Sequence, residues 1–166
     1  KEIAARYIHA NSNRASAPFI TVNSASIEPD RMEEVLFGRE IAGRGIEHGL
    51  LEEANGGVVY FDEIADMPLG TQSKILRVLV DQRFQRVGGT DKVQVDLRVV
   101  SSTNRDLPSA IAAGTFREEL FHRLNVVPIS VPSLEERRED ISVLAEHFLM
   151  EFHTKLGLPN RRLSED

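Results

Sequence analysis

Two neighbouring carboxylates, Asp62 and Glu63, stand directly after the apolar run Val58-Val-Tyr-Phe61. Such a run is typical of a strand that is buried on both faces of a parallel sheet. Ligands of open α/β sheets bind at the carboxyl ends of the strands, where this pair would lie. One carboxylate could hold a divalent metal ion while the other orients or deprotonates a water molecule. The alternative is a polar turn capped by acids, and the run and the acid pair alone do not decide between the two.

Polar residues that could assist this chemistry follow two other apolar runs. Asn23 comes after Phe19–Val22, and Thr103-Asn104 comes after Leu97–Val100. In one parallel sheet these polar side chains would lie at the same edge as the carboxylates, where they could position water or sense a phosphate. Taken alone, however, such residues are more often ordinary loop residues.

Arg117 and Arg123 stand six residues apart in a segment with a helical pattern. Arginine can stabilise the charge on a transferring phosphoryl group, either within one subunit or from a neighbouring one. On spacing alone, a solvated helix face with Arg117 paired to nearby acids is the favoured interpretation.

The elements that would position these residues alternate along the chain, which predicts an α/β domain with a largely parallel sheet. The predicted strands are 19–22, 58–61, 97–100 and 126–131, and the predicted helices are 2–11, 28–36, 69–82, 107–113 and 117–123. Residues 84–95 alternate around Gly88-Gly89 and predict a β-hairpin. Apolar residues over 139–153 predict an amphipathic helix that could begin a second, helical subdomain.

The composition excludes several classes of function. The 166 residues carry a net charge of -6, which argues against DNA binding through overall charge, and they include no cysteine for disulfides or thiolate metal sites. The five histidines lack metal-ligand spacing, and no apolar run is long enough for a membrane span. The absence of cysteine fits a reducing, cytoplasmic compartment. Because the first residue is Lys1 rather than Met, we expect a piece of a longer protein.

Taken together, the motifs resemble the AAA+ domain of bacterial enhancer-binding proteins, the sigma-54 activator family of NtrC type. The resemblance covers nearly the whole chain. It rests on LFG at 36–38, EEANGGVVYFDEIADMPLGTQSKILRVL at 52–79, FQRVGG at 84–89 and FREELFHRLNVVPISVPSLEERREDI at 116–141, in that order. It implies an AAA+ P-loop NTPase fold, with a three-layer α/β/α core and a mostly parallel sheet over 1–136. The start of a helical lid subdomain would occupy 137–166.

The resemblance also implies ATP and Mg²⁺ as cofactors and assigns the residues that bind them. Lys1 matches the phosphate-binding lysine that ends the Walker A motif. Asp62 and Glu63 match the Walker B pair, in which Asp62 holds Mg²⁺ directly or through water. Thr103 and Asn104 fall in the first sensor segment.

Three further residues take their roles from the resemblance. Asn23 matches an asparagine that holds the Walker B glutamate away from water until the nucleotide state changes. Arg117 and Arg123 match the arginine fingers that reach the ATP of the next subunit.

The chain departs from the family pattern in two places. It begins at Lys1, so the Walker A glycines are not part of the sequence, and we expect the isolated chain to bind ATP poorly and to be inactive. The GAFTGA loop of sigma-54 activators is replaced after Leu36-Phe37-Gly38 by Arg39-Glu-Ile-Ala-Gly-Arg-Gly-Ile-Glu-His-Gly49. This loose, glycine-rich segment resembles the NtrX branch of response regulators.

The expected function is the central ATP-binding and ATP-hydrolysing oligomerisation domain of a two-component transcriptional regulator. The resemblance implies self-association into a ring or partial ring, DNA binding through a separate domain and a sensor kinase acting on a receiver domain. Contact with sigma-54 is not expected without GAFTGA. Two alternatives stay open: a sigma-54-dependent activator with a divergent loop, and a nucleotide-gated assembly module with little hydrolysis.

Overall fold

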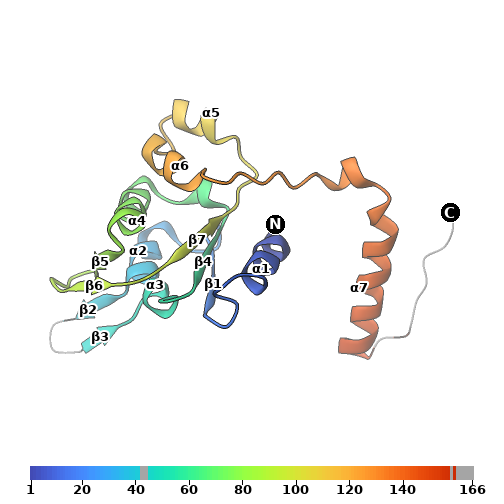
Figure 1. Ribbon diagram of the computed structural model, residues 1–166, viewed down its shortest axis with the longest axis horizontal. Coiled ribbons are helices and arrows are strands. Elements are labelled where there is room, and N and C mark those ends of the chain that lie inside the picture. Colours follow the sequence, from blue (N-terminus) through green and yellow to red (C-terminus); the bar gives the residue numbers. More distant parts are fainter. Residues whose placement is uncertain (42–44, 158, 160–166) are drawn as a thin grey trace. The chain divides into compact units, whose positions relative to one another are not determined.

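The computed structural model describes residues 1–41, 45–157 and 159, and the chain forms two compact units, Lys1–Pro128 and Ile129–Asp166. The first unit contains the strands and the helices that flank them (Figure 1). In the second unit, the 3₁₀ helix Leu134–Arg137 is followed by α7 (Asp140–Leu156), as the apolar pattern over 139–153 predicts. The end of the predicted lid segment, 160–166, lies outside the described residues.

Three parallel strands make the central sheet in the order β1-β4-β7. They are β1 (Phe19–Asn23), β4 (Val58–Asp62) and β7 (Arg98–Ser101). The middle strand is apolar and buried over its first four residues because both of its faces are covered. Asn23 lies opposite Asp62 in the register, so the carboxyl ends of β1 and β4 meet at one edge.

Helices cover both faces of this sheet, and the alternation along β4 explains how. Val59 and Phe61 point to one face, where they share a core with α2 (Pro29–Phe37) and α4 (Leu69–Asp81). Tyr60 points to the other face and stacks on Phe19 with ring centroids 6.1 Å apart. On that face Arg6 of α1 (Glu2–Ala10) lies over the Phe19 ring, at 4.8 Å from its centroid. These layers confirm the predicted α/β/α arrangement with a mostly parallel sheet.

The remaining predicted helices also form, with boundaries close to those expected. Asp106 accepts a hydrogen bond from the Ser109 N–H and begins α5 (Leu107–Ala112), where Pro108 suits the first turn. α6 (Glu118–Leu124) packs on α4 through buried Leu120. The predicted hairpin consists of β5 (Arg83–Gln85) and β6 (Lys92–Gln94). Among the described residues, no helix is long and apolar enough to cross a membrane.

The predicted strand over 126–131 is wrong. Residues 126–131 have no regular structure, and Val126, Val127 and Ile129 are 73%, 76% and 63% exposed. Pro128 lacks the N–H that a ladder needs, and none of the described strands pairs with the run. An apolar run becomes a strand only where a neighbouring backbone satisfies its hydrogen bonds.

The segment 39–49, which the sequence presents as a loose loop, contains a hairpin. It consists of β2 (Arg39–Ile41) and β3 (Gly45–Glu47), and α3 (Leu50–Glu53) follows it. Gly49, the last residue of the segment, touches Gly38, the residue before it: a Cβ atom on Gly49 would lie 2.2 Å from the Gly38 nitrogen, so only glycine fits there. Residues 42–44 lie outside the described residues.

Candidate functional site

Asp62 ends β4 with one carboxylate oxygen held by two hydroxyl groups. Its Oδ1 accepts hydrogen bonds from Ser102 Oγ at 2.7 Å and from the Tyr60 hydroxyl at 2.9 Å. The Ser102 hydrogen bond lowers the pKa of Asp62 against the opposing effect of burial, and Tyr60 and the charge of Lys1 lower it further. Asp62 is therefore an ionised acceptor at neutral pH.

Glu63 adopts a left-handed backbone conformation, with φ 51° and ψ 56°. This conformation costs a residue with a side chain about 1–2 kcal/mol. The surrounding backbone maintains it: the Ile64 N–H donates to Ser102 O at 2.9 Å, and the Asn104 N–H donates to Glu63 Oε2 at 2.9 Å. The carboxylate is therefore held off the line of the strand at the edge of the sheet.

Lys1 brings a positive charge to the same place. Its Nζ lies 3.6 Å from Glu63 Oε1, and both side chains are partly exposed. The structure thus brings Lys1, Asp62, Glu63 and the backbone of Asn104 together, although they come from separate segments of the chain. A cation beside two carboxylates with open access can bind a phosphate and a metal ion.

Asn23 and Thr103 lie at this edge, but their side chains bond to nearby backbone. Asn23 Oδ1 accepts from the Ala25 N–H at 3.1 Å, and Thr103 Oγ1 accepts from the Arg105 N–H at 3.0 Å. In this conformation the Glu63 carboxylate is bonded by Lys1 and Asn104 rather than by Asn23. The predicted switching role of Asn23 stays a prediction.

The two arginines lie against α4 rather than against the carboxylates. Arg117 Nε donates to Leu69 O at 3.2 Å, and Arg123 Nη2 donates to Leu79 O at 2.9 Å. Both residues are exposed. Their guanidinium groups are thus attached to opposite ends of one helix and remain accessible from outside the chain.

Gln72, which the sequence does not single out, fixes the start of the arginine segment. It is fully buried, and its Nε2 donates to Met67 O at 2.7 Å and to Thr115 O at 3.1 Å. Its Oε1 accepts from the Arg117 N–H at 2.9 Å. The signal that could have revealed it is a polar residue on the inward face of α4, beside Ile75 and Val78.

A magnesium ion fits the donors present at the edge. Mg²⁺ is usually bound by one or two carboxylates and completes its shell with water and phosphate oxygens. Asp62 supplies such a carboxylate, and no hydrogen bond from the described residues reaches its Oδ2. The described residues include no cluster of three or more metal-ligating side chains, so a closed protein cage is not built here.

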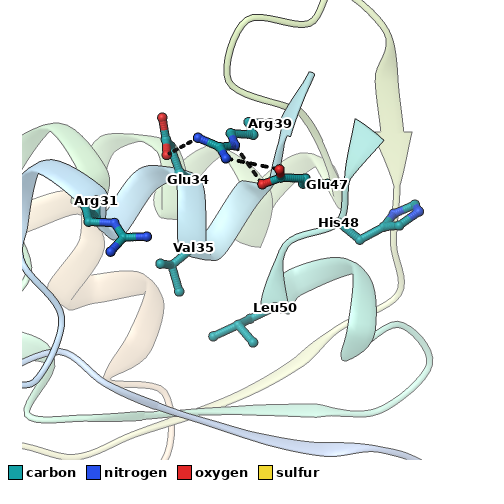
Figure 2. Close-up of a pocket in the computed structure, with 7 residues that line it drawn as sticks. All are labelled: Arg31, Glu34, Val35, Arg39, Glu47, His48 and Leu50. Atoms are coloured by element: carbon teal, nitrogen blue, oxygen red, sulfur yellow. Dashed lines mark hydrogen bonds and ion pairs between the residues drawn. The ribbon is translucent and has the colours of Figure 1, made fainter. Parts of the chain in front are cut away.

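A separate cavity of about 260 Å³ lies at the base of the β2–β3 hairpin. Figure 2 shows Arg39 between two carboxylates: its Nε is 2.7 Å from Glu47 Oε2 and its Nη1 is 3.4 Å from Glu34 Oε2. Its lining contains none of the predicted ATP-site residues; it consists of Arg31, Glu34, Val35, Arg39, Glu47, His48 and Leu50. The charge pairs close the hairpin onto α2.

Comparison with known sequences places the chain among bacterial regulators. Residues 1–130 match the family model described as the sigma-54 interaction domain. The chain is 54% identical to the nitrogen assimilation regulatory protein NtrX of Azorhizobium caulinodans, covering 100% of the chain and 37% of that protein. It is 46% identical to the DNA-binding transcriptional regulator NtrC of Escherichia coli, covering 98% of the chain and 36% of that protein. The chain thus spans just over a third of the length of these relatives.

Solved structures agree with this placement. The crystal structure of NtrX from Brucella abortus in complex with ATP matches with a TM-score of 0.92 and 56% identity, covering 100% of this chain and 38% of that one. The P-loop NTPase domain of the sigma-54 transport activator from E. coli matches with a TM-score of 0.52 and 17% identity, covering 80% of this chain and 75% of that one. The second likeness supports the fold alone.

Proposed function

The chain belongs to the sigma-54 interaction domain family, and from this premise we propose that it is the central ATP-binding and ATP-hydrolysing domain of a two-component transcriptional regulator. The observation that carries the proposal is the meeting of Lys1, Asp62 and Glu63 at the carboxyl edge of the sheet. The crystal structure of the similar NtrX from Brucella abortus with ATP supports nucleotide as the ligand.

Each of these side chains has a distinct part in the proposed reaction. Lys1 binds phosphate oxygens, and it must leave Glu63 to do so fully. Asp62 holds Mg²⁺, directly or through water; when bound, this ion neutralises charge that develops on the phosphate oxygens. Glu63 orients the attacking water and accepts its proton, while Thr103 and Asn104 sense the terminal phosphate.

Arg117 and Arg123 act on the ATP of a neighbouring subunit in a ring or partial ring. Their exposure and their attachment to α4, away from the carboxylates of their own chain, support action between subunits. A guanidinium group that approaches the phosphates stabilises the charge of the transition state. Asn23 exchanges its Ala25 contact for one with Glu63 when the nucleotide state changes.

ATP hydrolysis by the native protein tests the proposal. We expect Glu63→Gln to lower the rate by about a hundredfold or more while ATP binding persists, because the water loses its general base. Glu53→Gln, an exposed change on α3, is the matched control and should keep the wild-type rate. Equal rates for wild type and Glu63→Gln would contradict the assignment.

A second candidate function is assembly gated by nucleotide binding with little hydrolysis. It is favoured by the state of Glu63 in this structure, where Lys1 and the Asn104 N–H occupy the carboxylate. The same measurement separates the two functions. Near-background hydrolysis in both wild type and Glu63→Gln, together with ATP-dependent assembly, would support this candidate.

We also propose that the domain does not remodel sigma-54 holoenzyme, in contrast to activators that carry GAFTGA. The segment between Gly38 and Gly49 lacks that motif, and its described part is a short hairpin closed by Arg39 and Glu47. A transcription assay with sigma-54 holoenzyme tests this. Robust open-complex formation by the native protein would show instead a sigma-54 activator with a divergent loop.

The partners of the native protein follow from the same proposal. We place it in the cytoplasm, with DNA bound by a separate domain and a sensor kinase acting on a receiver domain. The boundary between the AAA+ core and the lid subdomain is proposed between residues 136 and 137, later in the chain than the division between the two compact units, which falls after Pro128.

A further inference from the structure

Three oxygen atoms converge at the end of β4. The Tyr60 hydroxyl and Ser102 Oγ lie 2.8 Å apart, and each lies within 2.9 Å of Asp62 Oδ1. Tyr60 and Asp62 are two residues apart on one strand and therefore share a face of the sheet, while Ser102 directly follows the neighbouring strand β7. The cluster thus depends on the pairing of β4 with β7.

The protons of the cluster are set by its chemistry. A tyrosine hydroxyl is protonated at neutral pH, so the Tyr60 hydroxyl can act as a donor to Asp62 Oδ1, from which it lies 2.9 Å away. The two hydroxyls carry two protons between them, and an ionised Asp62 carries none. Either both hydroxyls donate to Oδ1, or one hydroxyl donates to the other, which in turn donates to Oδ1. Each arrangement keeps Oδ1 occupied.

Tyr60 is held in place by packing as well as by these bonds. It is 1% exposed and stacks on Phe19 at an interplanar angle of 20°. A buried ring has few alternative rotamers, so its hydroxyl is a fixed donor. Oδ1 therefore faces hydroxyls from the body of the sheet, and Oδ2 lacks a hydrogen bond from the described residues.

We propose that Tyr60 and Ser102 are positioning residues for Asp62: they occupy Oδ1, fix the rotation of the carboxylate and assign Oδ2 to the magnesium ion or its water. This inference rests on the proposed function. Outer-shell groups that orient a ligating carboxylate contribute to metal affinity without touching the metal.

Magnesium-dependent nucleotide binding tests the inference in the native protein. A fluorescent ATP analogue is titrated in EDTA and at increasing free Mg²⁺. We expect Tyr60→Phe and Ser102→Ala each to raise the half-saturating Mg²⁺ concentration several-fold, and the double variant to raise it about tenfold. Binding in EDTA should stay unchanged, and neither change should matter once Asp62→Asn has removed the carboxylate.

Two controls separate positioning from simple stabilisation. Ser102→Thr keeps a hydroxyl and should remain near wild type, and Tyr7→Phe changes the other tyrosine, which is exposed on α1. A wild-type Mg²⁺ response in Ser102→Ala, even with a lower melting temperature, would overturn the inference. If Tyr60→Phe fails to fold, the two Ser102 variants still decide. A wild-type protein without any Mg²⁺ response would overturn the proposed function as well.

Discussion

Glu63 combines a proposed catalytic side chain with an unfavourable backbone conformation. Its φ of 51° is costly for any residue with a Cβ atom, yet the position carries a glutamate rather than a glycine. Strain of this kind persists where the surroundings enforce it, and here Ser102 and Asn104 bond on either side. The turn lifts the carboxylate off the strand direction, which places it beside Lys1 instead of within the sheet.

The strain at Glu63 gives a prediction about stability. Both Glu63→Gly and Glu63→Ala remove the carboxylate, but only glycine adopts a positive φ without cost. We expect the glycine variant to be the more stable of the two, with a free energy of unfolding about 1 kcal/mol higher than that of the alanine variant. Urea unfolding of the two proteins measures this difference. A more stable alanine variant would mean that the left-handed turn does not form in solution.

At the scale of elements, an ion pair between Glu52 and Arg86 joins α3 to the loop between β5 and β6. Arg86 Nε and Nη2 donate to the two oxygens of Glu52 at 2.8 and 2.5 Å, and these side chains are 11% and 12% exposed. Burial opposes the ionisation of Glu52, but the hydrogen bonds from Arg86 and His48 outweigh it and lower its pKa. The pair therefore attaches α3, which directly follows the β2–β3 hairpin, to the loop between β5 and β6.

This ion pair makes stability depend on pH in a defined direction. Because the folded pKa of Glu52 is lowered, its stabilisation is full above the ordinary value of 4.5 and is lost as the pH falls through the folded pKa. We expect Glu52→Gln to lower the free energy of unfolding by about 2 kcal/mol at pH 7. The loss should become progressively smaller as the pH falls below 4.5 and through the folded pKa of Glu52. Unfolding at a series of pH values checks this, with Glu53→Gln as the neighbouring control. A constant difference at every pH would contradict it.

Gln72 joins α4 to the segment that begins α6, which gives a second prediction for the elements. Gln72→Leu keeps most of the side-chain volume but leaves Met67 O, Thr115 O and the Arg117 N–H without their partner. We expect a loss of about 3 kcal/mol in the free energy of unfolding, together with slower ATP hydrolysis because Arg117 is displaced. Gln94→Leu, on exposed β6, should change neither quantity. If a folded Gln72→Leu protein hydrolysed ATP at the wild-type rate, Gln72 would not be needed to position Arg117.

The elements also show where the sequence predicts structure well. The apolar periodicity of α4 and the continuous apolar run of β4 predict a helix and a buried strand with nearly the boundaries that the structure shows. The β2–β3 hairpin is hidden because charged and glycine residues replace the alternating pattern. The run over 126–131 misleads for the opposite reason, since apolar character does not supply a backbone partner.

Some residues of the candidate site can likewise be predicted from the sequence, and others only from the fold. Asp62 and Glu63 follow a strand and stand out in the sequence. Tyr60 instead looks like part of an apolar run, and its bond to Ser102 joins residues that are 42 positions apart. Only the parallel pairing of β4 with β7 shows that they meet. The left-handed turn at Glu63 has no residue signal, because glutamate does not favour it.

At the scale of the whole molecule, the proposed reaction needs more than one copy of the chain. The carboxylates and Lys1 lie at one edge of the sheet, while the two arginines donate to backbone carbonyls near opposite ends of α4. A site completed by a neighbour's arginines would couple hydrolysis to assembly, as a ring or partial ring requires. A subunit with intact carboxylates and no partner would then be a poor ATPase.

Mixing two inactive variants of the native protein tests this central claim most directly. Glu63→Gln keeps the arginines and Arg117→Ala keeps the carboxylates, so each alone should hydrolyse ATP at a small fraction of the wild-type rate. In an equal mixture that exchanges subunits, we predict recovery to about a quarter of the wild-type rate, because that fraction of interfaces pairs an intact Glu63 with an intact Arg117. A mixture that assembles but stays as inactive as its components would contradict a shared ATP site.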